Sequence, residues 1–144
     1  MKKGFTIVEL LAIIIVIVVL IWITLPRFRS LQDRGNIAKA KRELMTLQAS
    51  VESYYVHNKS IYPALLADLI SVTPNIIGAA LPKDPFGAGE DYSYMLSPDK
   101  RYYVIYSVGS AGTGSALVNN SGSITEINGP SCIYVSNAGR DLEP

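Results

Sequence analysis

Glu9 is the residue of this sequence whose position most needs a chemical explanation. It lies inside an otherwise apolar run that extends from Phe5 to Leu25. A carboxylate at the centre of a membrane helix costs about 2.5–3.5 kcal/mol on insertion scales, and near a helix N-terminus the helix dipole offsets about 0.3–1 kcal/mol of that cost. Either the carboxylate reaches the headgroups, or it awaits a cationic partner. Cleavage between Gly4 and Phe5 would create one, because it would free an α-amine one helical turn from Glu9.

Other residues with reactive side chains do not form a recognisable catalytic set. Cys132 is the only cysteine and His57 the only histidine, so we expect a small buried thiol and a solvated histidine at a helix end. The run Gly109–Gly114 lacks the Gly-Lys-Ser/Thr ending of a phosphate-binding loop, and no helix pattern follows it, which favours a flexible turn. Four acids in loops could in principle act as paired carboxylates, but we expect them to be solvated: Asp84, Glu90, Asp91 and Asp99. We therefore predict no enzymatic activity and no catalytic residues.

Length and charge narrow the classes of partner. The chain has 144 residues and a net charge of +1, which gives no reason to expect a nucleic-acid partner. A single cysteine also excludes an intrachain disulfide.

The apolar run predicts a membrane-spanning helix. Phe5–Leu25 contains 21 residues, and a helix of that length spans about 31 Å, close to the thickness of the hydrocarbon layer. No small-residue signal-peptidase site follows it, so we expect the run to be retained. Lysines before the run and arginines after it nearly balance, and charge does not fix the orientation. Pro26 predicts a kink at the end of the run.

Beyond Pro26 the pattern predicts an amphipathic helix. Gly35 should weaken it by about 1 kcal/mol relative to Ala, and the helix should end around residues 55–58. We expect its apolar stripe to pack on its own domain; the stripe consists of Ile37, Ala40, Leu44, Leu47, Val51 and Tyr54.

Residues 58–144 predict a small globular head. Strand-like composition at residues 92–96 and 101–108, separated by the turn sequence Ser97-Pro98-Asp99-Lys100, indicates a β-hairpin. Further strands are expected at residues 122–128 and 132–135, a short helix at residues 64–70, and loops at residues 73–75 and 81–87. The predicted fold class is α+β, with a long N-terminal helix packed on a small antiparallel sheet.

The N-terminal residues Gly4-Phe5-Thr6-Ile7-Val8-Glu9-Leu10-Leu11 resemble the processing motif of type IV prepilins and pseudopilins. The resemblance implies a leader at residues 1–4, which a prepilin peptidase removes after Gly4 before methylating the amine of Phe5. It also implies that Glu9 and Phe5 align subunits during assembly, and that a proline at the position of Pro26 is common. The implied domains are the leader, a long helix at 5–57 with residues 5–25 in the membrane, and the head at 58–144.

The head carries a second resemblance. Leu81-Pro82-Lys83-Asp84-Pro85-Phe86-Gly87, followed by a hairpin and by Tyr106-Ser107-Val108-Gly109, is similar to the head of the major pseudopilin of type II secretion, with Phe86 where Trp is usual. That family commonly binds calcium in the loop after the last of these strands. Here that loop, residues 109–120, has no acidic residue, so the calcium site is not carried over. Binding through later acids that fold back stays open; these are Glu126, Asp141 and Glu143.

The resemblance implies a structural subunit of a type II secretion pseudopilus, with no cofactor, that promotes export of folded proteins. The implied partners are further copies of the chain in a helical filament, the prepilin peptidase, the inner-membrane assembly platform and minor pseudopilins. The implied location is the bacterial inner membrane, with a single pass and the head in the periplasm. A surface type IV pilin for adhesion, motility or DNA uptake is the alternative; the secreted cargo, the adhesive target and the filament symmetry stay open.

Overall fold

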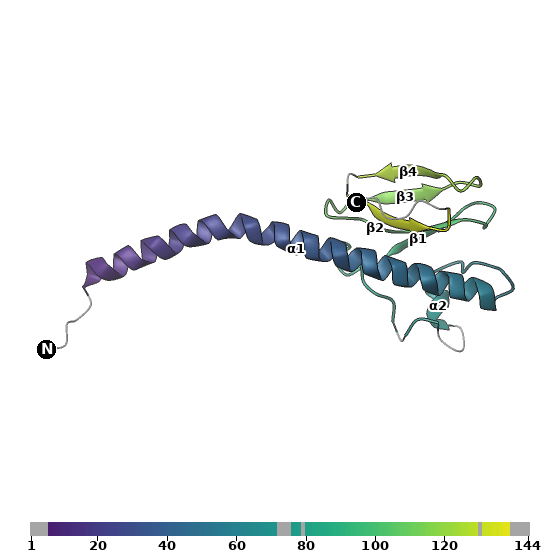
Figure 1. The fold of residues 1–144 in the computed structure, drawn as a ribbon, viewed down its shortest axis with the longest axis horizontal. Coiled ribbons are helices and arrows are strands. Elements are labelled where there is room, and N and C mark those ends of the chain that lie inside the picture. The colour runs from purple at the N-terminus through teal and green to yellow at the C-terminus, as the bar shows by residue number, and fades with distance from the viewer. Residues whose placement is uncertain (1–5, 72–75, 79, 130, 139–144) are drawn as a thin grey trace. The chain divides into compact units, whose positions relative to one another are not determined.

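The computed structural model describes residues 6–71, 76–78, 80–129 and 131–138, and within these it does not describe the side chains of residues 24–29 and 126. The chain divides into two compact units, Met1–Gly35 and Asn36–Pro144. Figure 1 shows the elements of both. The domain boundaries expected after residues 4 and 57 stay predictions.

Helix α1 is the longest element and extends from Ile7 to His57. It continues without interruption through Pro26 and Gly35, so neither residue ends the helix, and the weakening expected at Gly35 stays a prediction. In the first unit its apolar side chains lie open: every large one between Ile7 and Ile23 is more than 40% exposed.

No helix in the described part of the chain has both the length and the hydropathy that a membrane span requires.

In the second unit α1 buries one face against the head. Ala40, Leu44, Leu47 and Val51 are at most 1% exposed, and Ile37 and Tyr54 pack beside them. The prediction that the apolar stripe packs on its own domain is confirmed. The helix ends at His57, within the predicted range. Lys59 then adopts a φ of 55°, and the amide of Ser60 donates to the carbonyl of Tyr55 at 3.1 Å, a closing bond of the Schellman type.

Three strands form an antiparallel sheet in the order β1-β2-β5. They are β1 (Ser93–Leu96), β2 (Tyr103–Ser107) and β5 (Ile133–Ser136). Leu96 pairs with Tyr103 across the first hairpin, and Ser107 pairs with Ile133 in the second ladder. The predicted hairpin and the predicted last strand are confirmed.

A second antiparallel sheet consists of β3 (Ser115–Val118) and β4 (Ile124–Asn128). Strand β4 matches the strand predicted at residues 122–128, but β3 was expected to be loop, and that expectation was wrong. Its glycine-, serine- and asparagine-rich flanks hide a short alternation, in which Ala116 and Val118 are buried while Ser115 and Leu117 are half-buried. The head therefore has two small sheets and not one.

The short helix of the head is also smaller than predicted. Helix α2 covers only Asp68–Ser71. The Asp68 carboxylate accepts from the amide of Leu65, three residues before the helix, at 3.0 Å. The residues before Asp68 form turns in which an amide donates to the carbonyl three residues earlier. The amide of Asp68, for example, donates to the carbonyl of Leu65.

The head is built in three layers, as Figure 1 shows: the helix, the three-stranded sheet and the two-stranded sheet. Side chains alternate along β2, so that Tyr103 and Ile105 join the buried cluster with α1, whereas Val104 joins the cluster with Ala116 and Val118. This architecture confirms the α+β class.

Two tyrosines fix the helix to the head by their hydroxyl groups. Tyr103 donates to Glu52 Oε1 and Tyr92 donates to Glu43 Oε2, each at 2.7 Å. Burial, together with the neighbouring carboxylate, raises the pKa of both hydroxyls. Each hydroxyl therefore stays protonated at neutral pH and donates to its carboxylate. Glu52 and Glu43 on α1 thus receive hydrogen bonds from tyrosines of the head.

Candidate assembly site

The N-terminus of α1 is closed by a reciprocal contact between Thr6 and Glu9. The Glu9 amide lies 3.3 Å from Thr6 Oγ1 and 3.1 Å from the Thr6 carbonyl, and Thr6 Oγ1 lies 3.5 Å from Glu9 Oε2. Thr-x-x-Glu at a helix start has the spacing of a capping box. Glu9 was predicted as a site residue and Thr6 was not, although the Thr-x-x-Glu spacing is visible in the sequence.

Glu9 also lies at one end of an apolar groove on the surface of α1. The groove has a volume of about 310 Å³ and is otherwise lined by Ala12, Ile13, Val16 and Ile17. Glu9 is exposed, and it lies in the first helical turn, where the dipole favours a negative charge by about 0.3–1 kcal/mol. Such an arrangement can accept a cationic donor that arrives together with an apolar surface.

The remaining residues predicted for processing, assembly and the helix kink are Gly4, Phe5 and Pro26. Gly4 and Phe5 lie outside the described residues, so the predicted contact between Glu9 and a freed Phe5 amine stays a prediction. Pro26 lies within α1, but its side chain is not among those described, and the predicted kink is not tested.

The head motif is organised by Asp84, which we had expected to be solvated. That expectation was wrong: Asp84 is only 4% exposed. Its Oδ1 accepts from Ser107 Oγ at 2.7 Å and from the Phe86 amide at 3.0 Å, and its Oδ2 accepts from the Val108 amide at 3.0 Å. These three donors compensate for the loss of water around the carboxylate.

The other three loop acids are exposed, as expected: Glu90, Asp91 and Asp99. Asp91 pairs with Lys83 at 2.9 Å, and Asp99 pairs with Arg101 at 2.6 Å. Among the described residues, no three acidic, histidine or cysteine side chains are grouped so that they could hold a metal ion.

The glycine-rich run at residues 109–114 forms hydrogen-bonded turns. The amide of Gly112 donates to the Gly109 carbonyl and the amide of Gly114 donates to the Val108 carbonyl, both at 2.8 Å. Gly109 has a φ of 68°, and a Cβ there would collide with the Ser131 carbonyl. Strand β3 follows, so no helix N-terminus is available for a phosphate.

Cys132 is buried, as predicted, at 5% exposure. Burial, aided by the nearby Asp84, raises the pKa of its thiol to about 11, so almost no thiolate is present at neutral pH. His57 is exposed at the end of α1, with Nδ1 2.7 Å from the Ser53 carbonyl.

Comparison with known proteins identifies one informative similarity. The chain is 27% identical over 125 residues to the type II secretion system core protein G of Klebsiella pneumoniae, and the match covers 77% of this chain and 86% of that protein. No family model matches the chain, and no solved structure matches it either. The similarity confirms the resemblance to the pilin-like proteins of type II secretion that the sequence motifs had indicated.

Proposed function

We propose that this chain is a structural subunit of a type II secretion pseudopilus, which assembles through its N-terminal helix and promotes export of folded proteins. The similarity to a type II secretion core protein supports the secretion system. The observation that carries assembly is the exposed apolar surface of α1 from Ile7 to Ile23, interrupted only by Glu9. An unassembled soluble protein would not leave so long an apolar surface in water.

The precursor is held in the inner membrane by residues 5–25, with its head in the periplasm. The apolar run of the sequence, Phe5–Leu25, is longer than the part whose side chains are described, Ile7–Ile23. A prepilin peptidase cuts after Gly4 and methylates Phe5, and the assembly platform and minor pseudopilins then start the filament.

In the filament the helices of neighbouring copies pack together, and Glu9 pairs with the Phe5 amine of a neighbour. The exposed face of α1 in the second unit supports such packing, because Met45 and Val56 are 50% and 74% exposed. Removing one partner of a buried ion pair costs about 3–5 kcal/mol, so the pairing would select the correct register.

The subunit has no enzymatic activity and no resident metal in this proposal. In the turns at residues 109–114, the amides of Gly112 and Gly114 donate to backbone carbonyls, and Ser131 Oγ accepts from the Ala111 amide at 3.1 Å. That network supports a loop that closes without calcium.

The test is a clean deletion of the gene, followed by measurement of proteins in the medium and of fibres on the cell surface in one culture. We expect exoproteins to accumulate in the periplasm while surface fibres persist, and secretion to return when the gene is restored on a plasmid. Normal secretion with loss of the fibres would contradict the proposal and favour the surface pilin.

A further inference from the structure

The part of α1 that follows the apolar run carries an unbalanced positive charge. Residues 26–43 contain two acidic residues, Asp33 and Glu43, against six basic ones: Arg27, Arg29, Arg34, Lys39, Lys41 and Arg42. The whole chain has a net charge of only +1. Positive charge is therefore concentrated in this segment and is compensated elsewhere in the chain.

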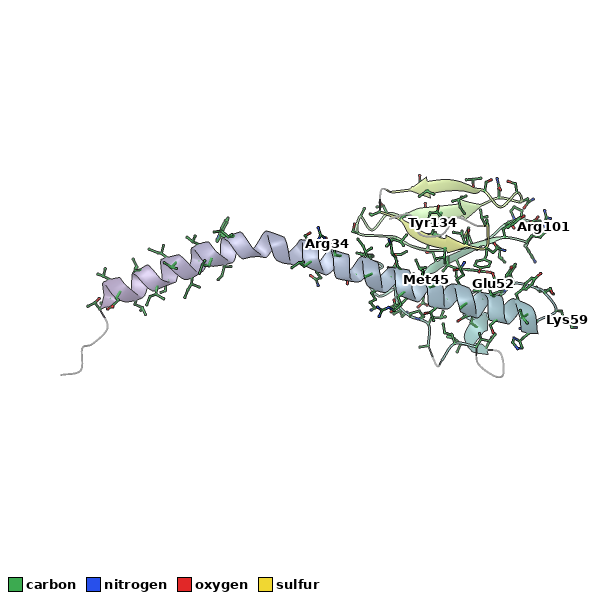
Figure 2. All side chains as sticks on the ribbon, viewed as in Figure 1. Arg34, Met45, Glu52, Lys59, Arg101 and Tyr134 are labelled. Atoms are coloured by element: carbon green, nitrogen blue, oxygen red, sulfur yellow. The ribbon has the colours of Figure 1, made fainter. Side chains whose placement is uncertain are left out.

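The surplus is not neutralised by ion pairs among the described side chains. Lys39 contacts Glu43 at 3.8 Å, and Glu43 also accepts the hydroxyl of Tyr92. Arg34, which Figure 2 labels on α1, is exposed and makes no ion pair with any described residue. Arg42 is likewise exposed, and its side chain has no described ionic partner. The charges of Arg34 and Arg42 therefore remain available to an external anion.

Their spacing along the helix divides them into two groups. At about 1.5 Å per residue, Arg27, Arg29 and Arg34 lie about 3, 6 and 14 Å beyond Leu25 along the axis. The headgroup layer on each side of a bilayer is about 5–8 Å thick, and charges are screened over about 8 Å at physiological salt. The first group thus falls within reach of the headgroups, whereas Lys39, Lys41 and Arg42 begin 14 residues after Leu25 in the sequence.

We propose that Arg27, Arg29 and Arg34, here called the arginine collar, bind the anionic headgroups of the lipid leaflet next to the head. This inference rests on the membrane insertion in the proposed function. Guanidinium groups match phosphate oxygens with paired hydrogen bonds, and basic residues beside an apolar helix are attracted to anionic lipid. The collar would enrich anionic lipid around the inserted helix and set its depth.

The single tryptophan of the chain provides the probe. Trp22 lies five residues before Arg27, so energy transfer from Trp22 to a dansyl group on the lipid headgroup reports which lipid surrounds this end of the helix. The full chain is reconstituted in mixed vesicles of phosphatidylcholine and phosphatidylglycerol, which carry trace dansyl label on one lipid or the other. We expect transfer to labelled phosphatidylglycerol to exceed transfer to labelled phosphatidylcholine by about twofold or more, and to fall in high salt.

Two matched triple variants assign the effect. R27Q/R29Q/R34Q should abolish the preference for phosphatidylglycerol, whereas K39Q/K41Q/R42Q, which removes the same charge farther along α1, should keep it. Equal transfer to both lipids in the unmodified chain would overturn the collar but leave insertion intact. A preference for phosphatidylglycerol that persists in R27Q/R29Q/R34Q, or that disappears only in K39Q/K41Q/R42Q, would overturn the collar as well. A collar variant that keeps its lipid preference but self-associates less would point instead to acidic residues of a second copy. Absence of transfer to either lipid would contradict membrane insertion itself.

Discussion

The hydroxyl of Ser107 donates a 2.7 Å hydrogen bond to Asp84 Oδ1 in the interior of the head. This contact joins the loop before β1 to the end of β2, and the same carboxylate also accepts from the amide of Val108. The two head segments that resemble the major pseudopilin are therefore held together by one side chain. Their joint occurrence has a physical explanation, because either segment alone would leave buried polar groups without partners.

Replacing Asp84 with Ala should destabilise the head by about 2–4 kcal/mol, because it leaves the Ser107 hydroxyl and two amides without their acceptor. Urea unfolding of the full chain in detergent, followed by near-ultraviolet circular dichroism of the head tyrosines, measures the loss. Glu90→Ala is the matched control: Glu90 is exposed and should change stability by no more than about 0.5 kcal/mol. Equal stability of the two variants would contradict the role given to Asp84.

Two backbone substitutions should act in opposite directions. Lys59 has a φ of 55° just after α1, a conformation that favours glycine, so Lys59→Gly should stabilise the head by about 0.5–1 kcal/mol. Gly109→Ala should destabilise it by more than about 1 kcal/mol, because the added Cβ meets the Ser131 carbonyl. Thermal unfolding of both variants checks the pair, and a destabilised Lys59→Gly variant would show that the lysine side chain matters more than the backbone.

Asp99 should titrate at unusually low pH. Hydrogen bonds from Ser97 Oγ and from Arg101, each at 2.6 Å, lower the pKa of its carboxyl to about 2. Since the pKa in the folded state lies below the ordinary value of 3.8, the stabilising contribution is complete above that value and disappears as the pH falls towards 2.

Carbon-detected NMR titration of the Asp99 carboxyl measures this pKa. Ser97→Ala should move it towards 3.8 by removing the largest favourable contact. A midpoint near 3.8 in the unmodified protein would contradict the hydrogen-bonded geometry.

Removal of calcium should leave the head unaffected. The turns at residues 109–114 bond internally and to Ser131, and we expect the unfolding temperature to be the same in chelator and in excess calcium. A bound ligand at 100 times its Kd would add about 2.7 kcal/mol of stability and raise the unfolding temperature by several degrees. A calcium-dependent rise of that size would show that acids outside the loop complete a site.

Periodicity and turn chemistry were sufficient to predict the elements that bury a regular apolar face. The stripe from Ile37 to Tyr54 has helical spacing and is the buried face of α1, and the turn Ser97–Lys100 lies between the two strands of the observed hairpin. Strand β3 was missed because its alternation covers only four residues between glycine-rich segments. Local pattern does not reveal that a second sheet buries it.

The burial of Asp84 could not be predicted for a related reason. A carboxylate becomes tolerable in the interior only when donors from distant segments meet it, and Ser107 lies 23 residues away in the sequence. The capping role of Thr6, in contrast, was predictable from the Thr-x-x-Glu spacing alone. Glu9 was predictable as a site residue because a single charge within an apolar run is visible in the sequence without knowledge of tertiary contacts.

Assembly through the N-terminal part of α1 is tested most directly by fibre formation of a Glu9→Ala variant. The unmodified chain, Glu9→Ala and the head control Glu90→Ala are produced at equal levels in cells that carry the complete secretion system and lack the native copy. Fibres of the subunit within the cell envelope are quantified by chemical crosslinking and immunoblotting, and the processed subunit in the membrane fraction is measured in parallel. We expect Glu9→Ala to be inserted and processed normally but to form no fibres, while Glu90→Ala forms them normally. Normal fibres from Glu9→Ala would contradict assembly through this carboxylate.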